Sequence, residues 1–147
     1  MQVTTQAVGK RYPPLSYLVG REKIREYASA VGETNQLHHD LEAARRAGYA
    51  DLVAPPMFAV VYAGRAVALA MFDPDVGLDY SLLVHVSQEF EWGPLVVAGD
   101  EVMTVTTVAE ISERAGRGFY VFRTDSTNQR GECVCSGIWT EMVREAP

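Results

Sequence analysis

The sequence predicts an α+β fold in which an antiparallel sheet curls around one long, buried helix. The first observation is the run 57–72, which is apolar on almost every side and carries Arg65 as its only charge. The second is a series of β-rich runs in the later part of the chain, separated by turn signals. A helix without a polar face must be covered by protein, and long consecutive strands are suited to cover it.

Two shorter helices are expected before the long one. Residues 1–20 are expected to be irregular, because two adjacent prolines and a glycine interrupt them. The range 21–31 carries apolar residues at helical spacing and is expected to form an amphipathic helix that stops at Gly32. Asp40 is expected to cap a short helix over 41–47, which has an acidic residue in its first turn and basic residues in its last.

Pro55 and Pro56 open the long helix, since the N–H groups of a first helical turn lack intrahelical acceptors in any case. The helix is expected over 56–72, and the acidic, proline-containing turn that follows ends it. The rest of the chain changes to a strand-like pattern rich in Val, Thr, Phe, Tyr, Ile and Trp. The expected strands are 82–92, 101–112, 118–127 and 132–143.

The composition suits one domain over 1–147, because the chain has 147 residues and 48% of them are hydrophobic. The net charge of −6 and the pI near 5.0 argue against a nucleic-acid binder and against a polybasic membrane anchor. The run 57–72 is interrupted by Gly64 and Arg65 and is too short to span a bilayer comfortably. No signal peptide is recognised, so a cytoplasmic location is expected.

The two cysteines, Cys133 and Cys135, lie two positions apart. In a strand this spacing puts both side chains on one face, where the geometry for a disulfide between them is poor. We therefore expect reduced packing residues. No metal site is expected, because His38 and His39 are adjacent and no third ligand with suitable spacing is evident.

The polar segment 32–40 is the strongest candidate for a functional site. It contains a carboxylate, a carboxamide and an imidazole in Glu33, Asn35 and His38. If Glu33 and His38 point into one cleft, they can hold one water molecule, with the carboxylate accepting its proton and the imidazole positioning it. Asn35 would then orient the carboxylate through its amide. Such a site adds water to, or removes it from, an activated double bond.

Simpler interpretations stand beside this one. A Glu and a His in a loop are more often surface polarity or a helix cap, and His39 is more simply a bystander. His85 lies in an expected strand, where cross-strand pairing or a solvent-facing position is the favoured interpretation. For Arg65, a stem packed on apolar surface with its charged head at the rim is an alternative to a role in a site.

The segment 32–40 reads Gly-Glu-Thr-Asn-Gln-Leu-His-His-Asp. It resembles the hydratase motif of MaoC-like (R)-specific enoyl-thioester hydratases, which runs approximately Gly-Asp-x-Asn-Pro-Leu-His-x-Asp. Further segments resemble actinobacterial proteins related to the subunits of 3-hydroxyacyl-ACP dehydratase. They are 20–26, 76–79 and 97–100, while 43–49 and 53–58 continue the hydratase-like pattern.

The resemblance implies a hot-dog fold, in which an antiparallel sheet wraps around the central helix 56–72. Domains of this family pair side by side, with an acyl tunnel at the interface of the pair. They interconvert trans-2-enoyl and (3R)-3-hydroxyacyl thioesters of coenzyme A or acyl carrier protein, without a metal or redox cofactor. The resemblance also implies that Glu33 is the base, that His38 is its acid/base partner and that Asn35 orients the carboxylate. The implied tunnel residues are Pro56, Met57, Phe58, Val61, Tyr62 and Arg65.

The chain departs from the family pattern at two important places. Glu33 replaces the family's aspartate, and a displacement of roughly one ångström can cost about 10²-fold in rate. Pro55 and Pro56 replace a His-Gly pair whose glycine N–H polarises the thioester carbonyl. Because proline has no N–H, Pro56 cannot donate that bond, and losing one such donor costs on the order of 3 kcal/mol of transition-state stabilisation. Gln36 also replaces a proline.

Three hypotheses follow. The first is an (R)-specific hydratase or dehydratase, with a neighbouring N–H such as that of Met57 replacing the lost donor. The second is a non-catalytic acyl-binding subunit that pairs with a MaoC-like catalytic subunit, because Pro56 resembles the substrate-binding half of these dehydratases. The third is a thioesterase, although the sequence contains no motif typical of that class. A homodimer or heterodimer is expected in either of the first two cases.

Overall fold

The computed structural model describes residues 3–144, so the predicted boundaries at 1 and 147 lie outside the described part. The strands are β1 (Leu15–Leu18), β2 (Leu83–Trp92), β3 (Glu101–Arg114), β4 (Arg117–Thr127) and β5 (Cys133–Val143). The helices are α1 (Arg21–Ala30), α2 (Leu41–Arg46) and α3 (Ala59–Met71). Short 3-10 turns are η1 (Gln36–His38), η2 (Pro56–Phe58) and η3 (Tyr80–Leu82).

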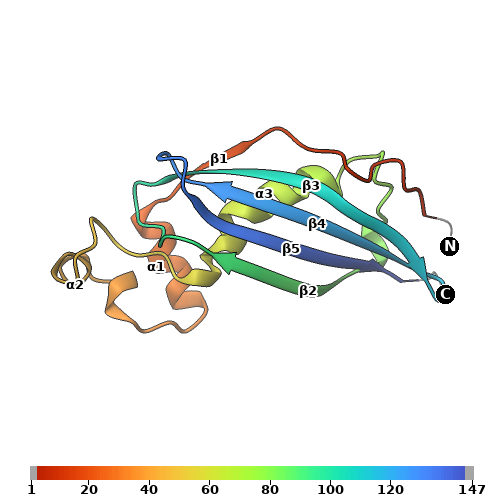
Figure 1. Ribbon diagram of the computed structural model, residues 1–147. Helices are drawn as coiled ribbons and strands as arrows, with labels where there is room; N and C mark the ends of the chain where they lie inside the picture. The colour runs from red at the N-terminus through yellow and green to blue at the C-terminus, as the bar shows by residue number, and fades with distance from the viewer. Residues whose placement is uncertain (1–2, 145–147) are drawn as a thin grey trace.

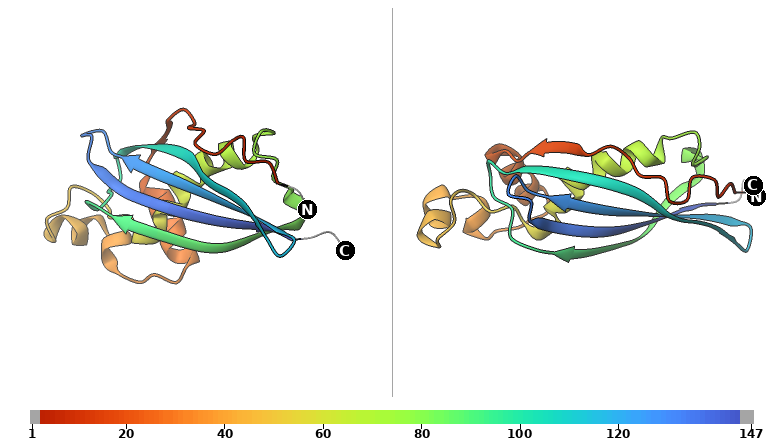
Figure 2. Two further views of the ribbon diagram at one scale, coloured as in Figure 1. Left: turned by 45° about the vertical axis from the view of Figure 1, so that its right-hand side comes forward. Right: turned by 45° about the horizontal axis from the view of Figure 1, so that its top comes forward.

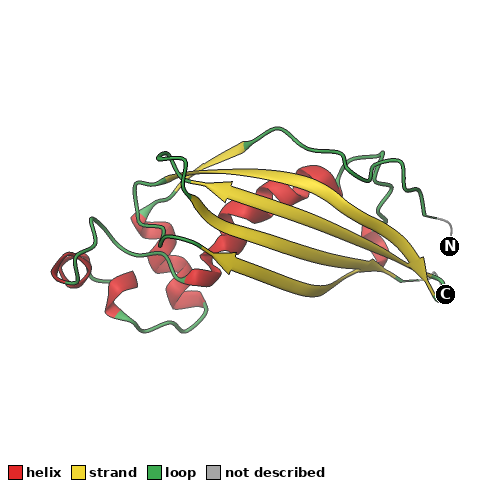
Figure 3. Cartoon of the chain, in the orientation of Figure 1, coloured by secondary structure: helices red, strands yellow, loops and turns green. Residues whose placement is uncertain are grey.

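The five strands form one antiparallel sheet in the order β1-β3-β4-β5-β2. Helix α3 lies across one face of this sheet, and the sheet curls around it (Figures 1 and 3). Helices α1 and α2 lie at the end of the sheet where α3 starts, and α2 extends beyond the strands (Figures 1 and 2). This is the predicted α+β architecture, and the four long strands begin and end within two residues of the expected positions.

The core lies between α3 and the curled sheet. Alternate side chains of the strands face the helix, and Val102, Val108, Phe122 and Val143 among them are fully buried. Helix α3 contributes mainly small side chains, which let it lie close to the sheet. Its buried residues are Ala59, Tyr62, Ala63, Ala66, Val67 and Ala70.

The expectation that residues 1–20 are irregular is wrong in one segment. Strand β1 pairs with β3 in antiparallel register, with Leu15 opposite Thr104 and Leu18 opposite Glu101. The strand is only four residues long, and alternates half-buried with exposed side chains. Its stability comes from hydrogen bonds to a partner that is distant in sequence, which local composition does not reveal.

The start of the long helix also differs from the expectation. The two prolines lead into the 3-10 turn η2, and the α-helix begins at Ala59 instead of at Pro56. Pro55 and Pro56 have no N–H, so the first turn is closed by the N–H of Phe58, which donates to the carbonyl of Pro55 at 2.8 Å.

One flank of α3 is uncovered in the single chain. Leu69 on α3 is 43% exposed, as are Met57 (45%) just before the helix and Phe72 (70%) at its end, and Arg65 on α3 is exposed as well. Burial of all but one narrow strip was expected, and the uncovered strip is wider than that. Apolar surface of this kind is typical of a face that another chain covers.

Two smaller expectations concern the sheet. Both cysteines are free, as expected, but only Cys135 is a packing residue, since Cys133 is exposed. His85 pairs across the strands with Glu141, whose carboxylate lies 2.6 Å from His85 Nδ1, as the favoured interpretation predicted.

Candidate active site

The loop between α1 and α2 is held in one shape by its own backbone and side chains. Gly32 ends α1 in the left-handed region, with φ of 72°, where glycine has no steric penalty. The Asn35 side chain accepts from the N–H of Leu37 at 3.0 Å and caps η1. Asp40 caps α2 by accepting from the N–H of Glu42 at 2.9 Å, as predicted. The functional side chains therefore project from a fixed scaffold.

Glu33 carries an ionised carboxylate at neutral pH. The backbone N–H of Asn35 donates to its Oε1 at 2.9 Å and lowers the pKa of Glu33 below its ordinary value. Asn35 thus orients the carboxylate through its backbone, and its side-chain oxygen serves as a cap.

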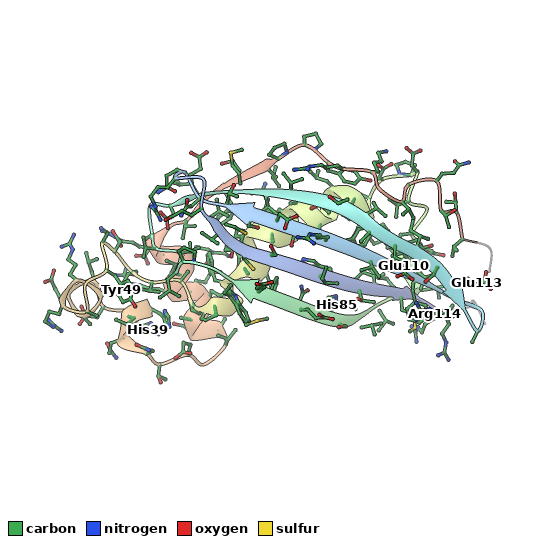
Figure 4. All side chains as sticks on the ribbon, viewed as in Figure 1. His39, Tyr49, His85, Glu110, Glu113 and Arg114 are labelled. Atoms are coloured by element: carbon green, nitrogen blue, oxygen red, sulfur yellow. The ribbon has the colours of Figure 1, made fainter. Side chains whose placement is uncertain are left out.

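His38 is 6% exposed, and its Nδ1 lies 2.6 Å from the carbonyl oxygen of Val53. A carbonyl only accepts, so Nδ1 carries the proton and Nε2 of the neutral ring is left as an acceptor. His39 is more than a bystander, because its Nε2 bonds to the carbonyl of Glu33 at 2.7 Å and holds the backbone there. Figure 4 shows His39 among the helices at this end of the molecule, whereas His85 lies along β2.

Glu33 faces a cleft at the start of the long helix. We call it the Glu33 cleft; its volume is about 330 Å³, and it is lined by Tyr27, Val31, Glu33, Pro55, Pro56 and Met57. The structure therefore brings the predicted carboxylate to the predicted helix start. His38 does not line the cleft, but its hydrogen bond to Val53 holds its ring two residues before Pro55 in the same connector.

A second hollow lies against the same prolines. This apolar cavity has a volume of about 350 Å³ and is lined by Ala54, Pro55, Pro56, Tyr62, Val134 and residues 92–96. Pro55 and Pro56 line both hollows. The indole N–H of Trp92 donates to the carbonyl of Pro56 at 2.9 Å and ties the end of β2 to the helix start.

The six predicted tunnel residues have different surroundings. Pro56 and Met57 line the Glu33 cleft, and Tyr62 lines the apolar cavity. Phe58 is fully buried and packs against Tyr27 and Tyr62 with ring centroids 5.5 and 6.3 Å away, so it belongs to the core and to neither hollow.

The other two tunnel residues lie further along α3. Val61 is half-buried, and Arg65 is exposed and makes no ion pair with any residue in 3–144. Neither lines either hollow of the single chain.

The wall formed by residues 92–96 was not predicted. These residues follow β2 and reach the helix start only because the sheet curls around α3. The one local signal was an aromatic residue with a polar edge, Trp92, directly before the Gly-Pro turn.

The described residues contain no group of three His, Cys, Asp or Glu side chains placed to hold a metal ion. No helix within residues 3–144 has the length and apolar character needed to cross a membrane. The burial of Cys135 raises the pKa of its thiol to about 11.

Comparisons with known proteins show the family and the fold of the chain. Residues 6–136 match the family model described as the FAS1-like, dehydratase domain region. A UPF0336 protein of Saccharopolyspora erythraea is 44% identical over 145 residues, which are 98% of this chain and 93% of the relative.

Two solved structures are similar in sequence as well as in fold. The C-terminally truncated HadBC (3R-hydroxyacyl-ACP dehydratase) complex of Mycobacterium tuberculosis matches with a TM-score of 0.80 and 33% identity, over 94% of this chain and 98% of that one. A MaoC-like dehydratase matches with a TM-score of 0.85 and 31% identity, over 96% of this chain and 43% of that one. The chain therefore belongs to the FAS1-like dehydratase family and shares the hot-dog fold of the MaoC-like dehydratases.

Proposed function

We propose that this protein is an (R)-specific hydratase or dehydratase that interconverts trans-2-enoyl and (3R)-3-hydroxyacyl thioesters. The observation that carries the proposal is the position of Glu33, which lines one cleft with Pro55, Pro56 and Met57 at the helix start. Family membership and the HadBC complex, which is named as a 3R-hydroxyacyl-ACP dehydratase, support the reaction class.

In the proposed reaction Glu33 and His38 hold the reacting water between them, which requires Nε2 of His38 to reach the Glu33 cleft, although its ring does not line that cleft in the single chain. The ionised carboxylate accepts one hydrogen of the water, and the unprotonated Nε2 of His38 accepts the other. As the water oxygen bonds to C3 of the enoyl thioester, Glu33 takes its proton and the electron pair of the double bond moves towards the carbonyl oxygen. Return of the proton to C2 completes the addition of H and OH. Dehydration follows the same steps in reverse.

The developing enolate oxygen needs a hydrogen-bond donor, and Pro56 has none. The N–H of Met57 is the next along the chain, and it has no acceptor among residues 3–144. Met57 lines the Glu33 cleft, so this N–H takes the role of the missing donor in our proposal. The apolar cavity behind the prolines, with Tyr62 in its wall, holds the acyl chain.

The substrate is an acyl thioester of coenzyme A or of acyl carrier protein, and neither a metal nor a redox cofactor takes part in the proposed steps. We place the reaction in the cytoplasm, where the two free cysteines remain reduced.

A second candidate function is a non-catalytic acyl-binding subunit that pairs with a MaoC-like catalytic subunit. Two observations favour it. Pro56 lacks the N–H of the family's glycine, and α3 has the uncovered apolar flank that contains Leu69 and Phe72. Strand β2 is also a ten-residue edge of the sheet, which leaves backbone groups available to another chain.

The deciding experiment is hydration of crotonyl-CoA by the purified chain alone, measured as loss of the enoyl absorbance. His38→Gln keeps a donor for the carbonyl of Val53 but removes the acid/base nitrogen, and we expect its rate to fall by about 10²-fold or more. His85→Gln is the matched control, since it makes the same change away from the loop, and its rate is expected to stay near that of the wild type.

The outcome separates the two candidates. Wild-type turnover no faster than that of His38→Gln would reject the hydratase function for the chain alone. Turnover that appears only after a catalytic hot-dog partner is added would establish the subunit function instead. A homodimer that turns over crotonyl-CoA without any partner would reject the subunit function.

A further inference from the structure

The carbonyl of the peptide unit between Pro56 and Met57 accepts a hydrogen bond from Trp92, which lines the apolar cavity and not the Glu33 cleft. We propose that Trp92 is a positioning residue, whose indole N–H fixes this peptide so that the Met57 N–H points into the cleft. The inference rests on the proposed function, in which that N–H stabilises the enolate oxygen.

The geometry follows from the planarity of the peptide bond. Trp92 Nε1 donates to the carbonyl oxygen of Pro56 at 2.9 Å, and Trp92 lines the apolar cavity. No peptide bond in the described chain is cis, so the C=O of Pro56 and the N–H of Met57 point in opposite directions. The N–H is therefore directed away from Trp92. Met57 lines the Glu33 cleft and not the apolar cavity.

A second contact fixes the next peptide of the turn. The hydroxyl of Tyr27 donates to the carbonyl oxygen of Met57 at 3.1 Å. The carbonyls on both sides of Met57 are thus held by side chains, which restrains the rotation of both neighbouring peptide planes. The donor that remains, the Met57 N–H, is preorganised, which is what a group that stabilises developing charge requires.

The hydrogen bond from Trp92 also strengthens the donor electronically. A carbonyl that accepts a hydrogen bond polarises its peptide unit and makes the N–H of the same unit a better donor. Loss of the indole N–H is therefore expected to weaken the Met57 donor even where the peptide keeps its orientation.

Trp92 is itself held in place by its neighbours at the end of β2. Its ring lies 5.8 Å from that of Phe90, and Phe90 packs edge-on against Trp139 at 5.7 Å. Gly93 allows the chain to pass the carbonyl of Cys133, since a Cβ at position 93 would lie 2.0 Å from that oxygen. Trp92 is nevertheless 49% exposed, so packing alone gives little reason for an indole at this position.

The test compares Trp92→Phe with the wild type. Phenylalanine keeps an aromatic ring beside Phe90 but removes the indole N–H. The first measurement is the amide signal of Met57 in protein labelled with ¹⁵N-methionine, a spectrum simplified by the five methionines of the chain. We expect the Met57 amide nitrogen and proton to move upfield in the variant. The matched control is Tyr12→Phe, which removes a side-chain donor that bonds to Asp73 at 2.6 Å beyond the far end of α3.

The second measurement is the hydration of crotonyl-CoA. We expect kcat to fall about 10-fold in Trp92→Phe with KM unchanged, which is less than the about 10²-fold or greater loss from removing such a donor outright. A purely structural role would not separate kcat from KM in this way. The Tyr12→Phe control is expected to leave both the Met57 amide signal and kcat unchanged.

The outcomes keep the two proposals apart. A Met57 amide that does not move in Trp92→Phe overturns the positioning role, whatever the activity. An unchanged kcat in that variant, with an active wild type, also overturns it. If the wild type hydrates no enoyl thioester, the hydratase function fails while the amide shift still decides whether Trp92 fixes the peptide.

Discussion

The two ends of the central helix are closed in different ways. At the start, two backbone carbonyls accept hydrogen bonds from the side chains of Tyr27 and Trp92, and the N–H of Met57 has no acceptor among the described residues. At the far end, the carboxylate of Asp73 accepts from Lys10 and from the hydroxyl of Tyr12, each at 2.6 Å. The start of the helix thus has a donor that is free within residues 3–144, the N–H of Met57, next to two hollows. At the far end, Asp73 binds Lys10 and Tyr12 and so fixes the N-terminal segment.

This difference indicates where chemistry can occur. A helix start presents N–H groups and a partial positive charge, which suit a developing anion. In this protein the start is also where a carboxylate, Glu33, lies next to apolar space. At the far end the carboxylate of Asp73 is already paired, and Phe72 stacks on Tyr80 with ring centroids 4.4 Å apart.

The largest expected effect tests whether the helix start is the rigid end. Phe58→Ala should lower the free energy of unfolding by about 4 kcal/mol, because Phe58 is fully buried and its removal leaves a cavity between aromatic rings. Phe72→Ala is the matched change at the other end, and with Phe72 70% exposed we expect a loss below about 1 kcal/mol. Urea unfolding of both variants measures the difference. Equal losses would contradict the comparison.

The next effect concerns activity at the helix start. Glu33→Gln removes the charge of the base with little change of shape, and we expect hydration of crotonyl-CoA to fall by at least about 10²-fold. The thermal midpoint should fall only slightly, because glutamine keeps an oxygen that can accept from the N–H of Asn35. Glu26→Gln makes the same change on the exposed face of α1, where Glu26 pairs only with Lys23 among the described residues. A loss of activity in Glu26→Gln as large as in Glu33→Gln would remove the special role of the cleft.

Most of the fold was predictable because local pattern and burial agree. The long helix was predictable from an apolar run that is too long for a typical strand, and the four long strands from β-rich runs divided by turn signals. Strand β1 was missed because it depends on pairing with β3. The first turn of the helix was misjudged because two prolines can begin an α-helix or a 3-10 turn, and sequence does not separate these cases.

The candidate site was predictable only where it is local in sequence. Glu33, Asn35 and His38 lie in one short loop, so their spacing was informative, and the structure adds a capping bond from the N–H of Leu37 to the Asn35 side chain. Trp92 and Val134 reach the prolines through the curvature of the sheet, which no spacing encodes. Phe58 lies next to Met57 in sequence but points into the core, because the 3-10 turn rotates it towards Tyr27.

The smallest expected effect concerns the far end of the helix. Hydrogen bonds from Lys10 and Tyr12 lower the pKa of Asp73 to about 2, from an ordinary value of 3.8. A carboxylate whose pKa is lower in the folded state stabilises the fold at any pH above its pKa in the unfolded state. This stabilisation is lost as the pH falls through the pKa of the folded state. The gap in thermal midpoint between the wild type and Asp73→Asn should therefore be constant above about pH 5 and close between pH 3.8 and about 2.

The same scan on Asp75→Asn is the control, since Asp75 bonds to the same lysine at 2.7 Å but is largely exposed. The difference in thermal midpoint between Asp75→Asn and the wild type should be smaller than that for Asp73→Asn, because solvent and salt screen an exposed ion pair. A gap for Asp73→Asn that persists to pH 2 would mean that the substitution disturbs the turn after α3 for reasons other than charge. In that case the far end would be held by the shape of its turn, and the contrast with the hydrogen-bonded start would have to be drawn on packing alone.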